Sequence, residues 1–452
     1  MESLRAAEDF MSIARKVAIK KPILILKAGR STAGQSAAHS HTGALAGNDK
    51  IFDLAFKRTG VLRLDTIEQL FDCAQALAMQ PYPDGHRLGI ITNAGGPGVL
   101  ATDYLVSNGG QLANLSNTCI EKLNVFLPQN WSKGNPVDLL GDANGEAYTK
   151  AFEVLKQEDG VDGILLILTP QAMTNPTEVA EKITAVAEGF NKPVLAVWMG
   201  EAAVMDGREV LEQARIPNFR YPENAVLAFL QMFRYREQQG KLKIHGEKRA
   251  SNFVVDKIAA QKIIAEVKER SRVQLLEHEA KALLNCYGIP VSHFSIAQNE
   301  ESAIKQAALI GFPVVMKVIS PDIAHKTDFG GVALNLTDEQ AVKIAYRQML
   351  AAVKKHHPVA HVEGVLIESM VSKPFELLIG AKQDDIFGPV IAFGQGGISV
   401  EVRQDVQFAL PPLNIATAKE MISSIRIFPL LEGFRGKAGI NLPLLQEVLI
   451  RF

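Results

Sequence analysis

The sequence predicts an α/β protein whose first part forms parallel sheets covered by helices and whose last part is α+β. Through the first 235 residues, apolar runs rich in Ile, Val and Leu alternate with amphipathic helical patterns. This alternation is typical of parallel sheets covered on both faces. Nearer the C-terminus, apolar runs follow one another without a helical pattern between them, which favours α+β. A length of 452 residues exceeds one core and suggests about three domains.

Residues 1–82 predict the order helix, strand, loop, helix, strand, helix. Apolar residues at three- and four-residue spacing predict the first helix; they are Leu4, Phe10, Ile13, Ala14 and Val17. The strands are expected in "PILILKA" and "VLRLD", and the later helices in "NDKIFDLAFKRTG" and "TIEQLFDCAQALAMQ". Because the chain opens on a helical pattern, we expect this region to be the second half of a domain.

Residues 84–235 repeat the alternation and predict a second open α/β domain. Its segments include "RLGIITNAGGPGVLATDYLVSNG", "QLANLS", "VDGILLILTP", "PTEVAEKITAVAEGF" and "KPVLAVWMG". Residues 236–270 are polar and rich in Lys and Arg, which favours a linker. Residues 271–452 predict the α+β domain, with strands in "PVVMKVI", "GVLIESMV", "ELLIGAKQ" and "PVIAFGQ". Its last run, "LPLLQEVLIRF", is helical without a cap, so we expect the domain to be incomplete there.

The charge balance excludes some partners. Lys and Arg total 48 against 49 Asp and Glu, so no global field favours nucleic acid or an anionic membrane. No apolar run approaches the length of a membrane span, and the N-terminus lacks a signal-peptide core. Cys73, Cys119 and Cys286 are widely spaced and form no metal motif, which favours structural thiols in a reducing cytoplasm.

Two glycine-containing segments follow predicted strands. "GRSTAGQS" approaches the phosphate-loop pattern GxxxxGK[ST], but Gln35 stands where that loop needs its lysine, which excludes a P-loop NTPase. "TNAGGPGVLATD" opens a helix as a dinucleotide fingerprint would, yet it lacks the GxGxxG spacing. Both segments still offer a helix N-terminus, whose free N–H groups and partial positive charge bind phosphate without a cation.

His41 lies in the segment "AAHSHTGALAGND". A neutral imidazole is a nucleophile at pH 7, and the small residues after it leave the backbone free to approach a ligand. His41 is therefore a candidate to accept a phosphoryl group. The alternative is a surface histidine that makes a hydrogen bond. His39 has a different position in the segment, and we interpret it as structural.

Five long motifs occur in an order that resembles the NDP-forming acyl-CoA synthetases, the superfamily of ADP-forming acetyl-CoA synthetase and succinyl-CoA synthetase. The motifs are "KPILILKAGRSTAGQSAAHSHTGALAGND", "TNAGGPGVLATD", "NPVDLLGDA", "FPVVMKVISPDIAHKTDFGGV" and "FGPVIAFGQGG". The resemblance implies two flavodoxin-like domains followed by an ATP-grasp domain. It also implies a reversible reaction in which acyl-CoA and phosphate give an acyl phosphate, which phosphorylates a histidine that in turn phosphorylates ADP.

The resemblance assigns residues of the first two regions. It implies that His41 is the phosphohistidine and that Glu2 matches the glutamate that holds it; a frayed terminal residue is the alternative for Glu2. The helix after "TNAGG" matches the one that cradles the phosphoryl group, with Thr92, Asn93, Gly95, Gly96 and Gly98 as the phosphate-binding residues. Asn135 and Asp138 either shape the same pocket or form a structural turn before Pro136.

The resemblance also assigns a nucleotide site in the third region. The matching residues are Lys317, His325, Lys326, Glu368, Val371 and Glu376. Buried lysine and glutamate on apolar strands are costly unless they pair with a ligand or with each other, so an internal ion pair is the alternative. His325 matches a second histidine that relays phosphate, and Lys326, Gly330 and Gly331 share its loop. A histidine on a moving loop carries phosphate over distance.

The family's CoA-binding domain and its Mg²⁺-ligating segment have no match in this sequence, so the metal ligands stay unassigned. We expect an acyl-CoA synthetase that uses ATP or ADP, Mg²⁺ and CoA, that is incomplete in this chain, and that forms oligomers. A complementary CoA-binding polypeptide is a predicted partner. One alternative is the nucleotide- or acyl-CoA-sensing region of a protein lysine acetyltransferase. Another is a degenerate fragment that cannot fold alone.

Overall fold

The computed structural model describes residues 1–31, 33–34, 48–244, 254–323, 325–373, 375–397 and 405–452. The chain divides into two compact units. Unit 1 is Met1–Glu247 with Gln383–Gly388, and unit 2 is Lys248–Lys382 with Pro389–Phe452. Among the described helices, none combines the length and the apolar character that crossing a membrane requires.

Unit 1 begins with the helix and strand order that the sequence predicts. The elements are α1 (Ala7–Ala18), β1 (Leu24–Leu26), α3 (Asp49–Thr59), β2 (Leu62–Leu64) and α4 (Ile67–Met79). Strands β1 and β2 pair in parallel, with Ile25 opposite Arg63. Helix α3 starts where the Asn48 side chain accepts a hydrogen bond from Lys50 N, and it ends at Gly60, whose φ of +76° suits glycine.

A five-stranded sheet forms the larger part of unit 1. Its strands are β3 (Arg87–Thr92), β4 (Gln111–Leu112), β5 (Val137–Asp138), β6 (Gly163–Leu168) and β7 (Val194–Trp198). The order is β4-β3-β6-β7, with β5 also beside β3, and these pairs are parallel. Every residue of β6 and β7 is buried, as expected for strands covered on both faces.

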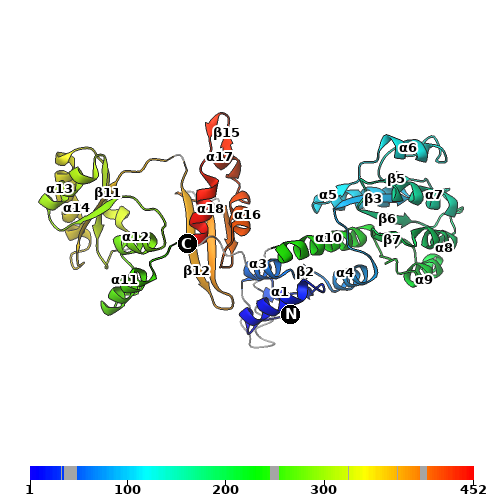
Figure 1. Cartoon of the computed structure of the whole chain (residues 1–452), viewed down its shortest axis with the longest axis horizontal. Coiled ribbons are helices and arrows are strands. Elements are labelled where there is room, and N and C mark those ends of the chain that lie inside the picture. Colours follow the sequence, from blue (N-terminus) through cyan, green and yellow to red (C-terminus); the bar gives the residue numbers. More distant parts are fainter. Residues whose placement is uncertain (32, 35–47, 245–253, 324, 374, 398–404) are drawn as a thin grey trace. The chain divides into compact units, whose positions relative to one another are not determined.

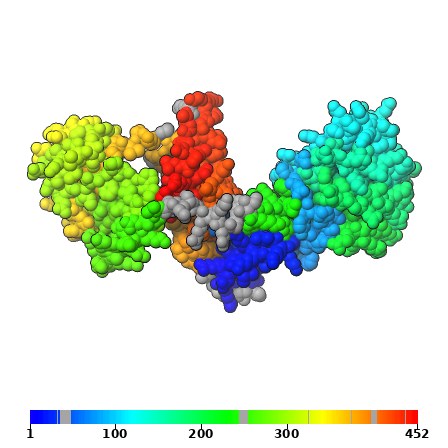
Figure 2. All heavy atoms as spheres, viewed as in Figure 1, coloured from blue at the N-terminus to red at the C-terminus, as the bar shows by residue number. Residues whose placement is uncertain are grey.

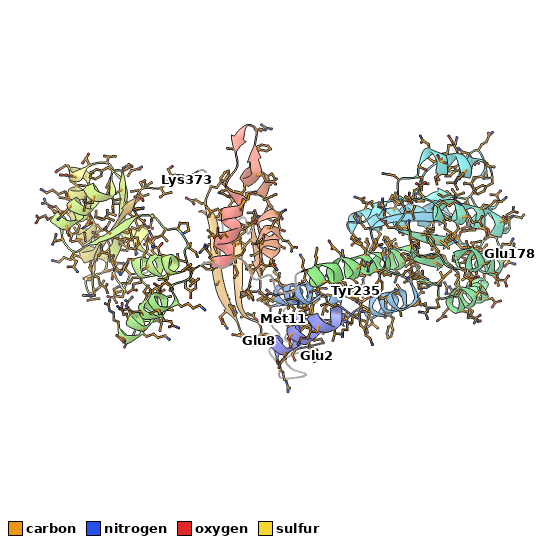
Figure 3. All side chains as sticks on the ribbon, viewed as in Figure 1. Glu2, Glu8, Met11, Glu178, Tyr235 and Lys373 are labelled. Atoms are coloured by element: carbon orange, nitrogen blue, oxygen red, sulfur yellow. The ribbon has the colours of Figure 1, made fainter. Side chains whose placement is uncertain are left out.

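Helices cover both faces of this sheet (Figure 1). On one face the core joins Leu165 and Ile167 to α4, α5 (Gly95–Ser107) and α10 (Pro222–Ile244). On the other, Ile164 and Leu166 pack with helices α6 (Asn117–Asn124), α7 (Gly145–Lys156), α8 (Pro176–Ala187) and α9 (Met205–Gln213), the last preceded by the short helix η1 (Ala202–Val204). Tyr235 of α10, labelled in Figure 3, donates a hydrogen bond to Ala18 O at 3.0 Å.

Helices occupy much of the segment that the sequence predicts as a linker. Helix α10 continues to Ile244, and α11 spans Lys257–Glu269. The boundary between the two units, after Glu247, lies within the predicted range 236–270. The Lys and Glu residues of this range support helices, which is why most of the predicted linker is helical.

The first part of unit 2 is a four-stranded sheet in the order β10-β9-β11-β8. The strands are β8 (Phe294–Ala297), β9 (Val314–Ile319), β10 (Val332–Leu336) and β11 (Gly364–Ser369). Strand β11 is antiparallel to β8 and β9, and β10 is antiparallel to β9. One face packs on α13 (Glu300–Ile310) and α14 (Glu339–His356), and Figure 2 shows these segments in yellow and green as one rounded body.

The second part of unit 2 has its own sheet and core. The sheet contains β12 (Leu377–Asp384), β13 (Gly388–Gln395) and β14 (Val406–Ala409) in that order. Its core includes residues of α16 (Ile415–Ser423), α17 (Phe428–Glu432) and α18 (Leu442–Arg451), and β15 (Gly433–Phe434) pairs with β16 (Lys437–Ala438). The pairs in the first part are antiparallel, and so is the pair of β13 with β14, which agrees with the predicted α+β class.

Candidate functional site

A cluster of charged side chains lies on one face of the four-stranded sheet in unit 2. Lys317 of β9 is directly opposite Leu366 of β11. Because side chains alternate along a strand, Glu368, two residues after Leu366, is on the same face as Lys317. Helix α12 (Glu277–Cys286) adds Glu277 and Lys281, and the sheet thus has charged residues on this face and an apolar core on the other.

The charged groups form one connected network. Nζ of Lys317 is 2.6 Å from Oε1 of Glu277, and Nζ of Lys326 is 3.1 Å from Oε2 of the same carboxylate. The Glu368 carboxylate pairs with both Lys317 and Lys281. Three ammonium groups and two carboxylates give this lysine–glutamate cluster a formal charge of +1.

A serine and partial burial complete the cluster. Ser292 Oγ donates a hydrogen bond to Glu368 Oε2 at 2.9 Å and accepts one from Lys281 Nζ at 2.9 Å. The Glu368 side chain is 8% exposed, whereas those of Lys317 and Glu277 are 23% and 27% exposed. The internal ion pair that the sequence left as an alternative is therefore present, on a surface that a charged ligand can still reach.

The electrostatics keep these groups ionised. Burial alone would raise the pKa of Glu277, but hydrogen bonds and charge interactions with Lys317 and then Lys326 outweigh it and lower that pKa. Burial likewise opposes ionisation of Glu368, while Lys281 and Lys317 bring its pKa below the ordinary value. Burial would lower the pKa of Lys317, yet the two glutamates raise it. A cluster of ammonium groups with an excess positive charge can bind an anion such as a phosphate.

The loop after β9 contains the second predicted histidine. His325 is exposed and directly precedes the short helix η2 (Lys326–Phe329), whose first residue belongs to the cluster. Gly330 has a φ of +85°, and the backbone N–H of Gly331 donates to Lys326 O at 2.7 Å. A Cβ at Gly331 would be 2.6 Å from that oxygen, so the two glycines allow the turn that closes this loop.

Val371 and Glu376, the other predicted nucleotide-binding residues, are both exposed and lie after β11. Gly396 N donates to Glu376 O at 2.7 Å, and a Cβ at Gly397, where φ is +82°, would be 2.7 Å from Glu376 Oε2. The glycine pair after β13 therefore makes room for Glu376. Among the described residues, the ion pairs of the lysine–glutamate cluster do not involve Glu376, and the apolar Val371 forms no ion pair.

In unit 1, the predicted phosphate-binding residues form the junction between β3 and α5. Thr92 and Asn93 are buried. The Asn93 side chain donates to Thr169 O at 2.8 Å and accepts from Thr169 N at 2.9 Å, so it joins the ends of β3 and β6. Gly95 and Gly96 are exposed at the start of α5, and a Cβ at Gly96 would meet no atom within 4 Å. Gly98 is buried against Thr92 and Pro136.

The side-chain amide of Asn135 forms all its hydrogen bonds with backbone groups of the sheet and its neighbouring segment. Its amide donates to Leu88 O at 2.8 Å and to Ala113 O at 3.0 Å, and its carbonyl accepts from Ile90 N at 2.9 Å. These contacts favour the structural alternative for Asn135. Asp138 accepts from Leu140 N at 3.0 Å, and its Oδ2 would be 3.4 Å from a Cβ at Gly95, so a carboxylate lies beside the start of α5.

His41 lies outside the described residues, and ion pairs occur on both sides of its segment. Arg30 contacts Asp49 at 3.4 Å and also pairs with Asp65. Arg63 of β2 contacts Asp49 at 2.5 Å. Glu2 lies near α1 (Figure 3) and is half-buried. Its negative charge acts on Lys27, a buried lysine whose pKa burial lowers.

The described residues contain no group of three or more His, Cys, Asp or Glu side chains that could hold a metal ion. Cys73 and Cys119 are buried, as the sequence predicts, and Cys286 is partly exposed. A pocket beyond the end of β7 lies between α9 and the start of α10, with Arg208 and Arg220 in its lining. None of the predicted site residues lines this pocket.

Three family models match consecutive parts of the chain. The succinyl-CoA ligase-like flavodoxin domain matches residues 1–77, the ligase-CoA domain matches residues 88–244, and an ATP-grasp domain matches residues 266–452. These matches have the order and the fold types that the sequence motifs predict.

The chain is 37% identical, over its whole length, to 4-hydroxybutyrate–CoA ligase (ADP-forming) of Nitrosopumilus maritimus, and it spans 64% of that protein. It is also 40% identical to the beta subunit of acetate–CoA ligase (ADP-forming) I of Pyrococcus furiosus, over 44% of this chain and 85% of that subunit. The chain belongs to the ADP-forming acyl-CoA synthetase family. A solved acetyl-CoA synthetase of Ca. Korarchaeum cryptofilum, in complex with phosphate and ADP, is similar to this family member at 32% identity and a TM-score of 0.52, over 55% of each chain.

In this synthetase-family chain, sequence reasoning missed three members of the lysine–glutamate cluster: Glu277, Lys281 and Ser292. The signal for the first two is their spacing of four residues within "EHEAK", which places both on one face of a helix. Nothing in the sequence indicates that this face meets β9 and β11. Ser292, in the segment between α12 and β8, has no pattern of its own.

Proposed function

We propose that this chain contains the phosphoryl-transfer part of a reversible, ADP-forming acyl-CoA synthetase. The overall reaction converts acyl-CoA, ADP and phosphate to a carboxylate, ATP and CoA through a phosphohistidine. The observation that supports it best is the lysine–glutamate cluster. Three lysines from β9, α12 and η2 converge there, and one of them, Lys326, directly follows the exposed His325 in the chain.

The proposed reaction has three balanced steps on one imidazole, and a relay between two histidines adds a step in which the second imidazole forms an N–P bond as the N–P bond to the first one breaks. Phosphate displaces the thiolate of CoA from the acyl group, which gives an acyl phosphate and CoA. An imidazole nitrogen then attacks phosphorus, so the P–O bond to the acyl group breaks and the carboxylate leaves. Finally an oxygen of the ADP β-phosphate attacks the same phosphorus, which gives ATP and restores the imidazole. A neutral imidazole is needed in the second step, because only its free nitrogen lone pair can form the N–P bond.

In unit 2 we assign the nucleotide phosphates to Lys317 and Lys326, since phosphate accepts charge-assisted hydrogen bonds from ammonium groups. Glu368 holds Lys317 and Lys281 in place. Glu376 and Val371 are proposed to contact the rest of the nucleotide. His325 is the proposed second carrier of the phosphoryl group, at the start of a loop that two glycines shape.

In unit 1 we assign the phosphoryl group to the start of α5, where the exposed Gly95 and Gly96 leave backbone N–H groups accessible. Thr92 and Asn93 are the buried residues of that junction, and Gly98 lets α5 pack closely on β3. His41 is the proposed phosphohistidine and Glu2 its partner. Arg30 and Asp49, on either side of the segment that contains His41, contact each other at 3.4 Å.

The whole reaction requires CoA, which we propose a complementary CoA-binding polypeptide or segment contributes. The relative from Pyrococcus furiosus is named as a beta subunit, which shows that this family includes enzymes built from separate chains. An oligomer and a cytoplasmic location remain predictions. The names of the relatives favour the synthetase over the sensing region of a lysine acetyltransferase, because they are ligases. The described residues offer no metal cluster, so this proposal assigns no Mg²⁺ ligands.

The test is phosphorylation of the purified chain. We expect ATP labelled in its γ-phosphate, supplied with Mg²⁺, to leave phosphate on the chain that is labile in acid and stable in base. His325→Ala should abolish labelling, and His41→Ala should lower it, because in the proposed relay the phosphoryl group of ATP reaches His325 before His41. His86→Ala, which changes a half-buried histidine of unit 1, should leave labelling unchanged. Equal labelling in wild type and in both site variants would exclude the phosphohistidine route. Calorimetric binding of ATP without any labelling would favour the sensor instead.

A further inference from the structure

The Glu277 carboxylate bridges two lysines in the manner of a phosphate. Its Oε1 contacts Lys317 and its Oε2 contacts Lys326, at 2.6 and 3.1 Å. Glu277 is the first residue of α12, so the partial positive charge of the helix start also favours its carboxylate. The two lysines that it joins are the pair to which the proposed function assigns the nucleotide phosphates.

We propose that Glu277 is an internal competitor for nucleotide phosphate, which pairs with Lys317 and Lys326 until the nucleotide displaces it. This inference rests on the proposed function, because it takes the same two lysines as the phosphate site. A carboxylate and a phosphate oxygen compete for the same N–H donors, and a bound carboxylate must give up its contacts before the phosphate can form its own.

Glu277 is better suited to displacement than Glu368. The Glu368 side chain is 8% exposed and holds Lys281, Lys317 and Ser292 from the middle of a sheet. The Glu277 side chain is 27% exposed and lies at a helix end, so a rotation brings its carboxylate into water, where hydration offsets part of the lost ion pairs. Lys317 keeps its contact with Glu368 after Glu277 leaves, and it therefore stays ordered for the incoming phosphate.

Displacement of Glu277 also affects the loop that contains His325. Lys326 follows His325 directly and is the first residue of η2. Its ion pair with Glu277 links this loop to α12. A nucleotide that takes over Lys326 replaces this link with one to its own phosphate. In the nucleotide-bound state the loop that contains His325 would therefore contact the nucleotide instead of α12. Nucleotide binding and the position of this loop are coupled only if the two states differ in such contacts.

The experiment compares ADP affinity, measured by calorimetry without Mg²⁺, in the full chain and in Glu277→Gln. The amide keeps the size of the side chain and removes its charge, so we expect ADP to bind about tenfold more tightly. Glu300→Gln is the matched control. Glu300 is also the first residue of a helix, is also 27% exposed and also holds a cation, Arg347. Removal of the Glu300 charge should leave the affinity for ADP unchanged.

Glu277→Asp keeps the charge, but its side chain is too short to bridge both lysines, so we expect an intermediate gain in ADP affinity. This variant also tests the proposal if Glu277→Gln does not fold. Circular dichroism and thermal melting identify which variants are folded. An unchanged or weaker ADP affinity in both folded Glu277 variants, with normal binding by the wild type, would overturn the competitor role and leave the proposed function intact. Absence of ADP binding in the wild type and in all variants would overturn both.

Discussion

Lys317 on β9 and Glu277 at the start of α12 are joined by a contact of 2.6 Å between Nζ and Oε1, although 40 positions separate them in the chain. This contact fixes the helix against the charged face of the sheet. It also holds the lysine ammonium in the place where the family resemblance expects a phosphate to bind. The same ion pair therefore contributes to the stability of unit 2 and to its proposed function.

Lys317→Met should abolish nucleotide binding and weaken the fold. The substitution removes the cation that Glu277 and Glu368 share, while Lys326 and Lys281 stay paired with them. The loss of these charge-assisted hydrogen bonds costs about 1.5–3 kcal/mol. Calorimetry with ATP and chemical unfolding measure the two effects. Lys305→Met, at an exposed position of α13, should change neither, and ATP binding by Lys317→Met would contradict the assignment.

Acid should loosen the contact between α12 and β9. The pKa values of Glu277 and Glu368 are lowered in the folded protein from an ordinary value of 4.5. Their stabilising contribution is therefore fully present above about pH 4.5 and is lost as the pH falls through the lowered values. The raised pKa of Lys317 sets the opposite limit, because its contribution is lost only as the pH rises through that value.

Hydrogen exchange of β9 and α12 amides between pH 3 and pH 7, corrected for intrinsic rates, measures the effect of acid. Glu277→Gln should reduce the pH dependence of protection, since the variant lacks one of the two titrating carboxylates. An identical dependence in wild type and variant would show that Glu277 does not contribute.

Gly96→Ala should separate stability from phosphate binding at the start of α5. A Cβ at this position meets no atom within 4 Å, so alanine fits and its lower conformational entropy in the unfolded chain should stabilise the protein by about 0.4–1 kcal/mol. The same methyl group would occupy the space next to the accessible N–H groups and should slow phosphorylation of the chain. Faster or equal labelling would place the phosphoryl group elsewhere.

Asn135→Ala should destabilise unit 1. The substitution leaves Ile90 N, Leu88 O and Ala113 O without their partners, at a cost of about 2–3 kcal/mol. Thermal unfolding measures it. At low temperature, the phosphorylation per folded molecule of the variant should equal that of the wild type, because the Asn135 amide is hydrogen-bonded to the backbone. A loss of labelling in fully folded protein would instead give Asn135 a direct role in the pocket.

Asp49→Asn should disturb the segment that contains His41 through its end. Asp49 contacts Arg30 and Arg63, and the Arg63 side chain is only 10% exposed. Arg63 keeps its ion pair with Asp53, so loss of the Asp49 charge should cost about 1.5–3 kcal/mol and lower the rate of phosphorylation. Glu146→Gln, which removes an exposed ion pair on α7, should leave both the rate and the stability nearly unchanged. Equal rates in the two variants would mean that the end of the segment does not position its histidine.

Several features of the protein follow from the sequence alone. Buried strands such as β6 and β7 are continuous apolar runs, and α3, α4 and α8 begin at or near the positions that their patterns predict, because burial on both faces and helix periodicity leave a direct record in the residue order. The order of five motifs identifies the family, and the resemblance points to Lys317, Lys326 and Glu368 as nucleotide-binding residues.

Tertiary structure decided which groups these residues meet. The spacing of Glu277 and Lys281 puts both on one face of α12, but the packing of that helix determines that the face lies against β9 and β11 and not against water. Asn135 shows the same limit, since its neighbour Pro136 suggested a turn while its partners are three backbone groups of the sheet. Local sequence records periodicity and turn chemistry, whereas contacts between distant segments depend on the free energy of packing the whole unit, which no local pattern encodes.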